Sequence, residues 1–164
     1  FAVGALPPTT RGVVGAPNPA TTTTVTLPQG GALKFPVRFP LHFSAASGGS
    51  ATATNIGSAD APPVITFYGP LDHPVLYHET LGLYLGLNLT LGSSDVVVAK
   101  PETPSLVQGT LTTTPTTPRM GSMTTGSNLI DLRVVPGQNR FLLRANSYDT
   151  GRVEIVYRDT WEGI

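Results

Sequence analysis

The side chains best suited to chemistry in this sequence are its three histidines, and their spacing does not match a metal site. His73 and His78 are five positions apart, so on an extended strand they point to opposite faces of the sheet, and Pro74 interrupts the segment between them. A zinc site needs several ligands that converge on one point, and His42 adds none at a suitable spacing. We therefore predict no metal and no cofactor, and we expect Asp72 and His73 to form the tip of a turn rather than a catalytic dyad.

Other catalytic arrangements are also missing from the sequence. It contains no Gly-x-Ser-x-Gly elbow, and Ser50 ends a Ser-Gly-Gly-Ser run that is typical of a turn. Two groups of carboxylates would suit glycoside hydrolysis only if folding brought them within a few ångströms of each other. We interpret them as surface acids: Asp72 with Glu79, and Asp149 with Glu154 and Asp159. The sequence therefore predicts no catalytic residue and a protein that is not an enzyme.

Tyrosine and tryptophan side chains suggest a different chemistry, the stacking of aromatic rings on sugars. The aromatic candidates are Tyr68, Tyr77, Tyr84, Tyr148 and Trp161, and among them we predict Tyr68, Tyr77 and Trp161 for glycan stacking. Tyr84 alternates out of phase with the leucines around it, so it should lie on the opposite face of its strand from them. Aromatic residues with one polar end are also common at sheet rims and protein interfaces, and we favour that structural interpretation.

Charge is scarce and balanced along the chain. Ten Lys and Arg oppose ten Asp and Glu, charged residues make up 12% of the sequence, and no basic run occurs. A nucleic acid partner requires a positive patch, so we predict none. The most apolar segment, residues 81–91, is too short for a membrane span, so we also predict no membrane partner. So little charge suits a surface that neighbouring proteins cover.

Glycine and proline, 18 and 16 of 164 residues, divide the chain into short segments. Residues 1–33 have repeated Pro and Thr with scattered apolar residues, which predicts a linker or extended N-terminal arm. Residues 34–164 are predicted to form one β-sandwich domain. Phe35 and Phe39 alternate with prolines in a segment predicted as an edge strand or strap.

Apolar alternation without any helical pattern predicts an all-β fold, an antiparallel β-sandwich or jelly roll of about eight to ten strands. The expected strands cover residues 51–55, 64–68, 75–79, 81–91, 96–98, 106–107, 129–135, 140–145 and 152–158. Six leucines alternate through residues 81–91, which predicts one strand at the centre of the core. Residues 109–127 are predicted as a long loop without regular structure, and residues 136–139 as a turn.

An ordered set of short segments resembles one known family. These segments are Leu33-Lys34-Phe35-Pro36 through Phe39-Pro40, residues 51–55 with 61–63, Thr66-Phe67-Tyr68-Gly69-Pro70 with His73-Pro74, Leu87-Asn88-Leu89-Thr90-Leu91, Val135-Pro136-Gly137-Gln138-Asn139, and Tyr157-Arg158-Asp159-Thr160-Trp161. Together they resemble the C-terminal domain of the distal tail proteins, also called minor tail proteins, of siphophages, the bacteriophages with long flexible tails. The order and spacing hold from residue 17 to the end of the chain, although residues 100–127 match poorly.

The resemblance implies a structural virion protein at the distal end of the tail. In this family an upstream domain forms a hexameric ring, and the C-terminal domain lies outside the ring as a galectin-like β-sandwich. Residues 1–33 would then be the linker from such an upstream domain. The implied partners are the tail tube, the tail-tip hub and other copies in the ring. The His, Arg and Trp pattern with which galectins bind galactosides is not recognisable here, so sugar binding does not follow from the fold.

Two functional hypotheses remain. In the first, the protein binds other tail proteins, and the expected contact residues are Phe35, Phe39, Met120, Met123, Arg158, Asp159 and Trp161. In the second, it is a carbohydrate-binding module for host attachment, whose partner is a host-surface glycan stacked on Tyr68, Tyr77 or Trp161.

Overall fold

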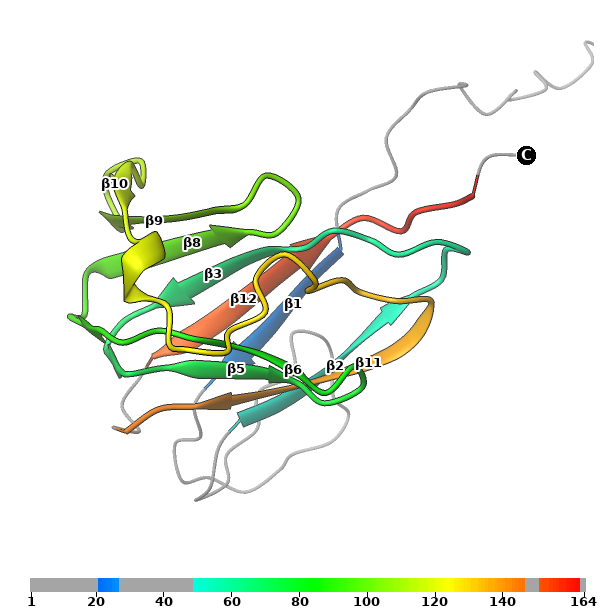
Figure 1. Cartoon of the computed structure of the whole chain (residues 1–164), viewed down its shortest axis with the longest axis horizontal. Coiled ribbons are helices and arrows are strands. Elements are labelled where there is room, and N and C mark those ends of the chain that lie inside the picture. The colour runs from blue at the N-terminus through cyan, green and yellow to red at the C-terminus, as the bar shows by residue number, and fades with distance from the viewer. Residues whose placement is uncertain (1–20, 27–48, 147–150, 163–164) are drawn as a thin grey trace, which may run out of the picture.

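Two antiparallel sheets pack face to face in the computed structural model, which describes residues 21–26, 49–146 and 151–162 (Figure 1). This architecture confirms the predicted all-β sandwich. Phe35 and Phe39, with the rest of the expected strap, lie outside the described residues, as do residues 1–20 and 27–33 of the expected arm.

The larger sheet has six strands in the order β1-β12-β3-β8-β9-β10. Their bounds are β1 Thr21–Thr26, β12 Arg152–Tyr157, β3 Val64–Tyr68, β8 Asp95–Lys100, β9 Ser105–Thr110 and β10 Thr117–Pro118. Every neighbouring pair is antiparallel. The predicted strand at residues 64–68 is confirmed at both ends by β3.

The smaller sheet has four strands in the order β2-β11-β5-β6. Their bounds are β2 Gly49–Asn55, β11 Gly137–Arg144, β5 Val75–His78 and β6 Leu83–Gly86. A two-stranded sheet, β4 Leu71–Asp72 with β7 Thr90–Leu91, and a 3-10 helix, η1 Met120–Ser122, complete the described elements.

The core fills the space between the two sheets with side chains from alternate strand positions. Val153, Ile155 and Tyr157 face inward from β12, as the sequence predicted. The buried Tyr157 hydroxyl donates a hydrogen bond to the carbonyl oxygen of Thr54 at 2.8 Å, so it ties the larger sheet to β2. A buried hydroxyl needs such a partner because an unsatisfied polar group in the core is destabilising.

Within the segment predicted as a linker or arm, Thr21–Thr26 form strand β1. This strand pairs with β12, and its Val25 is buried against the core. Threonine is β-branched and favours strands, but one valine among five threonines gives no apolar alternation that would identify a strand from the sequence. The partner strand β12, which lies far along the chain from β1, decides the conformation.

The leucine run at residues 81–91 is also not the single central strand that we predicted. The backbone turns at Gly82, where φ is 66°, and only Leu83–Gly86 then form β6, at the edge of the smaller sheet. Thr90–Leu91 form β7 in a different sheet. Leu85 and Leu91 are still buried, so the alternation identified side chains of the core without showing that the strand is continuous.

Residues 109–127 are not a structureless loop. After β10 and η1 the chain returns along the edge of β6, where the amide of Thr124 donates to the Gly86 carbonyl at 2.9 Å and the amide of Asn128 donates to the Tyr84 carbonyl at 2.8 Å. The Asn88 amide donates to the Ser122 carbonyl at 2.7 Å. These backbone bonds close a sheet edge, and no side-chain periodicity accompanies them that sequence reasoning could detect.

Two further predictions are wrong near the start of β11. Residues 129–131 form a turn rather than part of a strand, and β11 begins at Gly137 inside the predicted turn at residues 136–139. The fully buried Asn139 side chain explains why a strand begins where a turn was predicted, because its amide takes the place of a backbone hydrogen-bond partner. Its Oδ1 accepts from the Val135 amide at 2.9 Å, and its Nδ2 donates to the carbonyl oxygens of Val135 and Gly137 at 2.7 and 3.0 Å.

We predict that Asn139→Ala lowers the free energy of unfolding by about 2 to 3 kcal/mol, because it leaves backbone groups beside a buried site without partners. Urea denaturation measures this difference. Gln138→Ala is the matched control, since Gln138 is exposed on the same strand, and its effect should stay within about 0.5 kcal/mol. Equal effects of the two substitutions would contradict the role assigned to Asn139.

Candidate functional site

Four outward-facing side chains form a row across the smaller sheet. Leu142 of β11 lies opposite Ser50 of β2 on one side and opposite Tyr77 of β5 on the other. Tyr77 in turn lies opposite Tyr84 of β6. All four side chains are partly exposed, and three strand spacings make the row about 14 Å long. We call the outer surface that carries this row, with the residues on either side of it, the tyrosine face.

The two tyrosines give this face an aromatic centre. Their ring centroids are 5.9 Å apart, and the ring planes are tilted by 37°. The Tyr84 hydroxyl donates a hydrogen bond to the Thr125 carbonyl at 2.8 Å, which fixes the outer edge of that ring. The guanidinium carbon of Arg144 lies 5.7 Å from the centre of the Tyr77 ring, within the range of a cation–π contact.

Two shallow hollows lie on the tyrosine face. One, of about 320 Å³, is lined by Tyr77, Tyr84, Arg144 and Glu79, among others. The other, of about 530 Å³, extends over β2 and is lined partly by Arg140. An ion pair of 2.8 Å between Arg140 Nε and Glu79 Oε2 joins the two hollows. The face therefore combines apolar rings with charged groups along their sides, a combination that is common in ligand-binding sites.

The structure does not bring the three predicted glycan-stacking residues together. Tyr68 faces outward from the larger sheet, where the Arg152 guanidinium lies 4.2 Å from its ring centre. Tyr77 lies on the tyrosine face, and Trp161 lies in the C-terminal segment. Tyr84 joins Tyr77 instead. The sequence placed Tyr84 on the polar side of its strand, but only the pairing of β5 with β6 shows which residue it meets.

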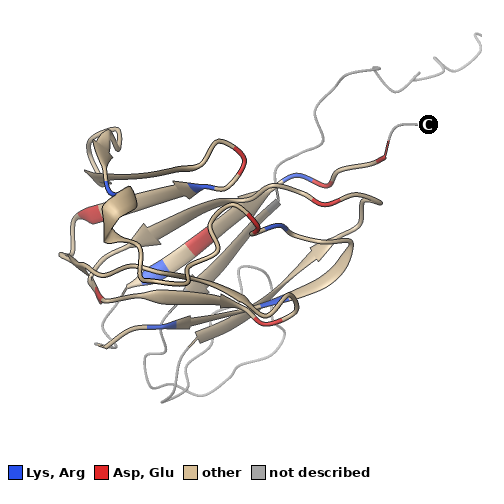
Figure 2. Cartoon of the chain, in the orientation of Figure 1, with Lys and Arg blue, Asp and Glu red and all other residues tan. Residues whose placement is uncertain are grey.

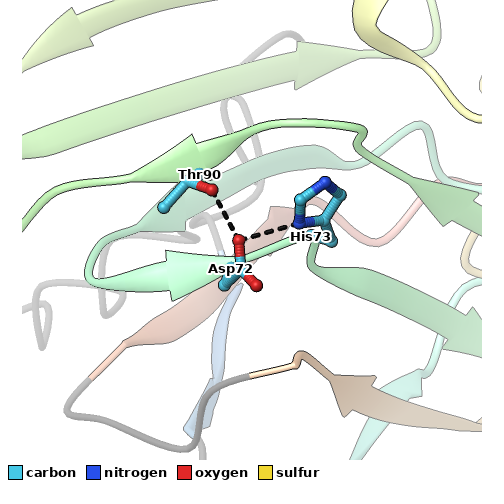
Figure 3. Close-up of polar contacts among 3 residues, drawn as sticks. All are labelled: Asp72, His73 and Thr90. Atoms are coloured by element: carbon cyan, nitrogen blue, oxygen red, sulfur yellow. Dashed lines mark hydrogen bonds and ion pairs between the residues drawn. The ribbon is translucent and has the colours of Figure 1, made fainter.

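Asp72 is the last residue of β4, and His73 follows it in the bend before β5, where its φ is 48° (Figure 3). Asp72 Oδ1 accepts a hydrogen bond from the Thr90 hydroxyl and lies 2.7 Å from His73 Nδ1. The Thr90 bond and then the His73 bond lower the pKa of Asp72. Both bonds converge on one carboxylate oxygen, so the imidazole does not reach the hydroxyl as a catalytic base would.

His78 has a structural role in the core. Its Nε2 donates to the Arg133 carbonyl at 2.9 Å, and its Nδ1 accepts from the Leu81 amide at 3.3 Å. These two bonds fit a neutral ring that carries its proton on Nε2. Burial lowers the pKa of His78. Across residues 21–26, 49–146 and 151–162, no three His, Cys, Asp or Glu side chains form a group that could bind a metal.

The C-terminal segment is paired along its length with residues 56–60. The Ala59 amide donates to the Thr160 carbonyl at 2.9 Å, and the Ile56 amide donates to Asp159 Oδ1 at 3.2 Å. Gly57 is required here because a Cβ at this position would lie 2.1 Å from the Thr160 carbonyl oxygen. We call residues 56–60 and 158–162 together the C-terminal strip.

The predicted contact residues differ in how much of their surface is exposed. Trp161 and Ile56, both in the C-terminal strip, have 58% and 68% of their surface exposed, and Arg158 is also exposed. Met120 is exposed in η1. Met123 instead packs against the core, where its backbone bridges to Leu87, so it supports the edge of β6 rather than offering a free surface.

Acidic and basic residues are interspersed over the described elements, without a large region of one sign (Figure 2). No helix in the described ranges is long and apolar enough to cross a membrane. Comparisons with protein-family models, curated proteins and solved structures gave no match for this chain.

We predict that stability depends on pH through His78. Burial lowers its folded-state pKa below the unfolded value of about 6.5, so below that pH the unfolded chain binds more protons than the folded chain. The contribution of His78 to the free energy of unfolding should therefore be constant above about pH 7.5. The free energy of unfolding should fall as the pH decreases from about 7 toward the folded-state pKa of His78.

Urea denaturation of His78→Gln and of the control Gln138→Ala across this pH range tests the prediction. Gln138 is exposed and has no titratable group, so its variant should keep the pH dependence of the unmodified protein, whereas His78→Gln should lose most of it. A pH dependence that is unchanged in His78→Gln would show that another group is responsible.

Proposed function

We propose that this chain is a non-enzymatic structural domain of a siphophage tail, which binds neighbouring tail proteins at the distal end of the tail. Two features support the proposal: the ordered sequence resemblance to distal tail proteins, and a two-sheet sandwich of the kind that this resemblance implies. The observation that carries the protein-contact role is the pair of large apolar side chains on the C-terminal strip, Ile56 and Trp161.

The C-terminal strip has the properties of a preorganised protein-binding surface. One backbone hydrogen bond and two bonds from backbone amides to side chains join its two segments, so little flexibility is lost when a partner binds. Tryptophan is among the residues that most often dominate the energy of a protein interface, and exposed Arg158 suits the polar rim around it. In a ring of identical subunits, symmetry would present one such strip from each copy.

We predict that antibodies raised against the whole chain label the distal end of the tail in intact virions, because the domain would be a peripheral part of the particle. Immunogold electron microscopy measures the position of the label. Labelling of the head, or no labelling of the particle, would contradict the proposal.

Variants of the C-terminal strip test the contact itself. Replacing Trp161 and Ile56 together by serine should reduce the amount of this protein in purified virions, measured by quantitative immunoblot, since loss of one dominant aromatic contact weakens an interface by about 2 kcal/mol or more. Leu111→Ser is the matched control, because Leu111 is similarly exposed at the opposite end of the sandwich. Equal incorporation of all three proteins would place the contact elsewhere.

A second candidate function is a carbohydrate-binding module for attachment to the host surface. The observation that favours it is the Tyr77–Tyr84 pair, whose rings line a hollow on the tyrosine face. Sugar rings have apolar faces that pack on aromatic side chains, and the hydroxyls around them bond to polar groups nearby. Glu79 and Arg140 provide such groups beside the rings.

We predict that Tyr84→Ala and Tyr77→Ala each weaken binding to host cell-wall glycans by about tenfold, because each removes an aromatic contact worth about 1 to 1.5 kcal/mol. A glycan array followed by isothermal titration calorimetry measures the affinity. Tyr68→Ala is the control, since Tyr68 lies on the other sheet. Absence of binding to every glycan of the array would remove this candidate.

A further inference from the structure

We propose that the tyrosine face selects acidic glycans, in which the guanidinium of Arg144 pairs with a carboxylate or phosphate group of a sugar whose ring packs against Tyr77 and Tyr84. The inference rests on the glycan-binding function proposed above. It specifies that the ligand is negatively charged and how the ligand is oriented on the sheet. It is carried by the positions of the two arginines on β11.

Arg144 is placed to reach a ligand on the aromatic row. It lies two residues after Leu142 on β11, so both side chains are on the same face of the strand. The strand register places Arg144 opposite Val75, two residues along β5 from Tyr77 and on the same face. The exposed guanidinium therefore lies beside the Tyr77 ring, at 5.7 Å from its centre.

The charge of Arg144 is available to a ligand. Among the described residues, no carboxylate lies within salt-bridge distance of it. A guanidinium has five N–H donors in a fork that matches the two oxygens of a carboxylate or phosphate. The cation–π contact with Tyr77 does not require the N–H donors, which can therefore bind an anion.

Arg140, the other outward-facing arginine of β11, is neutralised by its ion pair with Glu79 at 2.8 Å. Glu79 follows β5 at the end opposite Val75, and the four intervening steps correspond to about 13 Å. Among the described residues, the face thus has a positive charge without a carboxylate partner at one end and the Glu79–Arg140 ion pair at the other. This difference would direct the acidic group of a sugar toward Arg144 and its hydroxyl groups toward Glu79.

The two rings are already oriented for binding. The Tyr84 hydroxyl is fixed by the Thr125 carbonyl, and the Tyr84 carbonyl accepts from the Asn128 amide, so the segment after η1 holds this residue from outside. Because both tyrosines are partly buried in the sheet surface, few side-chain rotations are lost when a ligand binds.

The larger sheet provides an internal comparison. Arg152 lies over Tyr68 there at 4.2 Å, but the residue opposite Tyr68 on β8 is Val96, so no second tyrosine is present. Burial, and then the negative charge of Glu154, raise the pKa of Tyr68. A nearby carboxylate disfavours an anionic ligand, so the Arg152–Tyr68 pair is not expected to bind one.

Isothermal titration calorimetry of the full chain tests the inference with three probes: trigalacturonic acid, the neutral galactose trimer of the same linkage, and galactose 6-phosphate. The unmodified protein should bind the acidic trimer about tenfold or more tightly than the neutral one, because a charge-assisted pair is worth about 1.5 to 3 kcal/mol. Comparing the uronate with the sugar phosphate shows which kind of acidic group is preferred.

Arg144→Gln should remove the preference for the acidic trimer, so that the variant binds the acidic and the neutral trimer with similar affinity. The matched control Arg152→Gln should keep the preference. Both side chains are exposed, and circular dichroism confirms that each variant is folded. Tyr84→Ala should weaken binding of the acidic and the neutral trimer alike.

Three results would overturn the inference in distinguishable ways. Equal affinity of the unmodified protein for the two trimers would reject the selection of acidic glycans while glycan binding stands. No binding of any probe would reject both proposals for the tyrosine face. A preference that survives Arg144→Gln, or that Arg152→Gln removes, would place the anion site elsewhere.

Discussion

The pairing of β11 with β2 on one side and β5 on the other is the constraint on which the smaller sheet depends. Alternate residues of β11 point in opposite directions, so Phe141 and Leu143 fill the core while Leu142 and Arg144 reach the outer surface. A shift of this strand by one residue would exchange the two sets. The buried amide of Asn139 bonds to the backbone just before the paired residues and so helps to fix where the strand begins.

The same pairing produces the surface on which the functional proposals are based. The tyrosine face is built on strands rather than on loops, so its side chains are held at sheet spacing and by the hydrogen bonds that close the β6 edge. The C-terminal strip is a separate surface, at the end of the sandwich where β2 finishes (Figure 1). A partner on the strip and a ligand on the tyrosine face would therefore use different residues of the same rigid domain.

Local pattern was sufficient where turn residues bound a short apolar segment, as Pro62-Pro63 and Gly69-Pro70 do for residues 64–68. It also identified the inward-facing side chains of the strand predicted at residues 152–158, Val153, Ile155 and Tyr157. It failed at residues 81–91, because alternation continues through Gly82 although the backbone turns there. It failed again at residues 136–139, because asparagine and glycine usually indicate a turn, whereas here the Asn139 side chain takes the place of a backbone partner.

The sequence by itself determined the fold class, the absence of a strongly charged surface and the outward position of Tyr84, because these follow from composition and from the two-residue period of a strand. Only the tertiary structure decided that Tyr77 meets Tyr84 and that Arg144 lies beside them. Arg144 is 67 positions from Tyr77 along the chain. The register between such distant strands is set by how the whole sheet pairs and packs, and a local pattern contains no information about it.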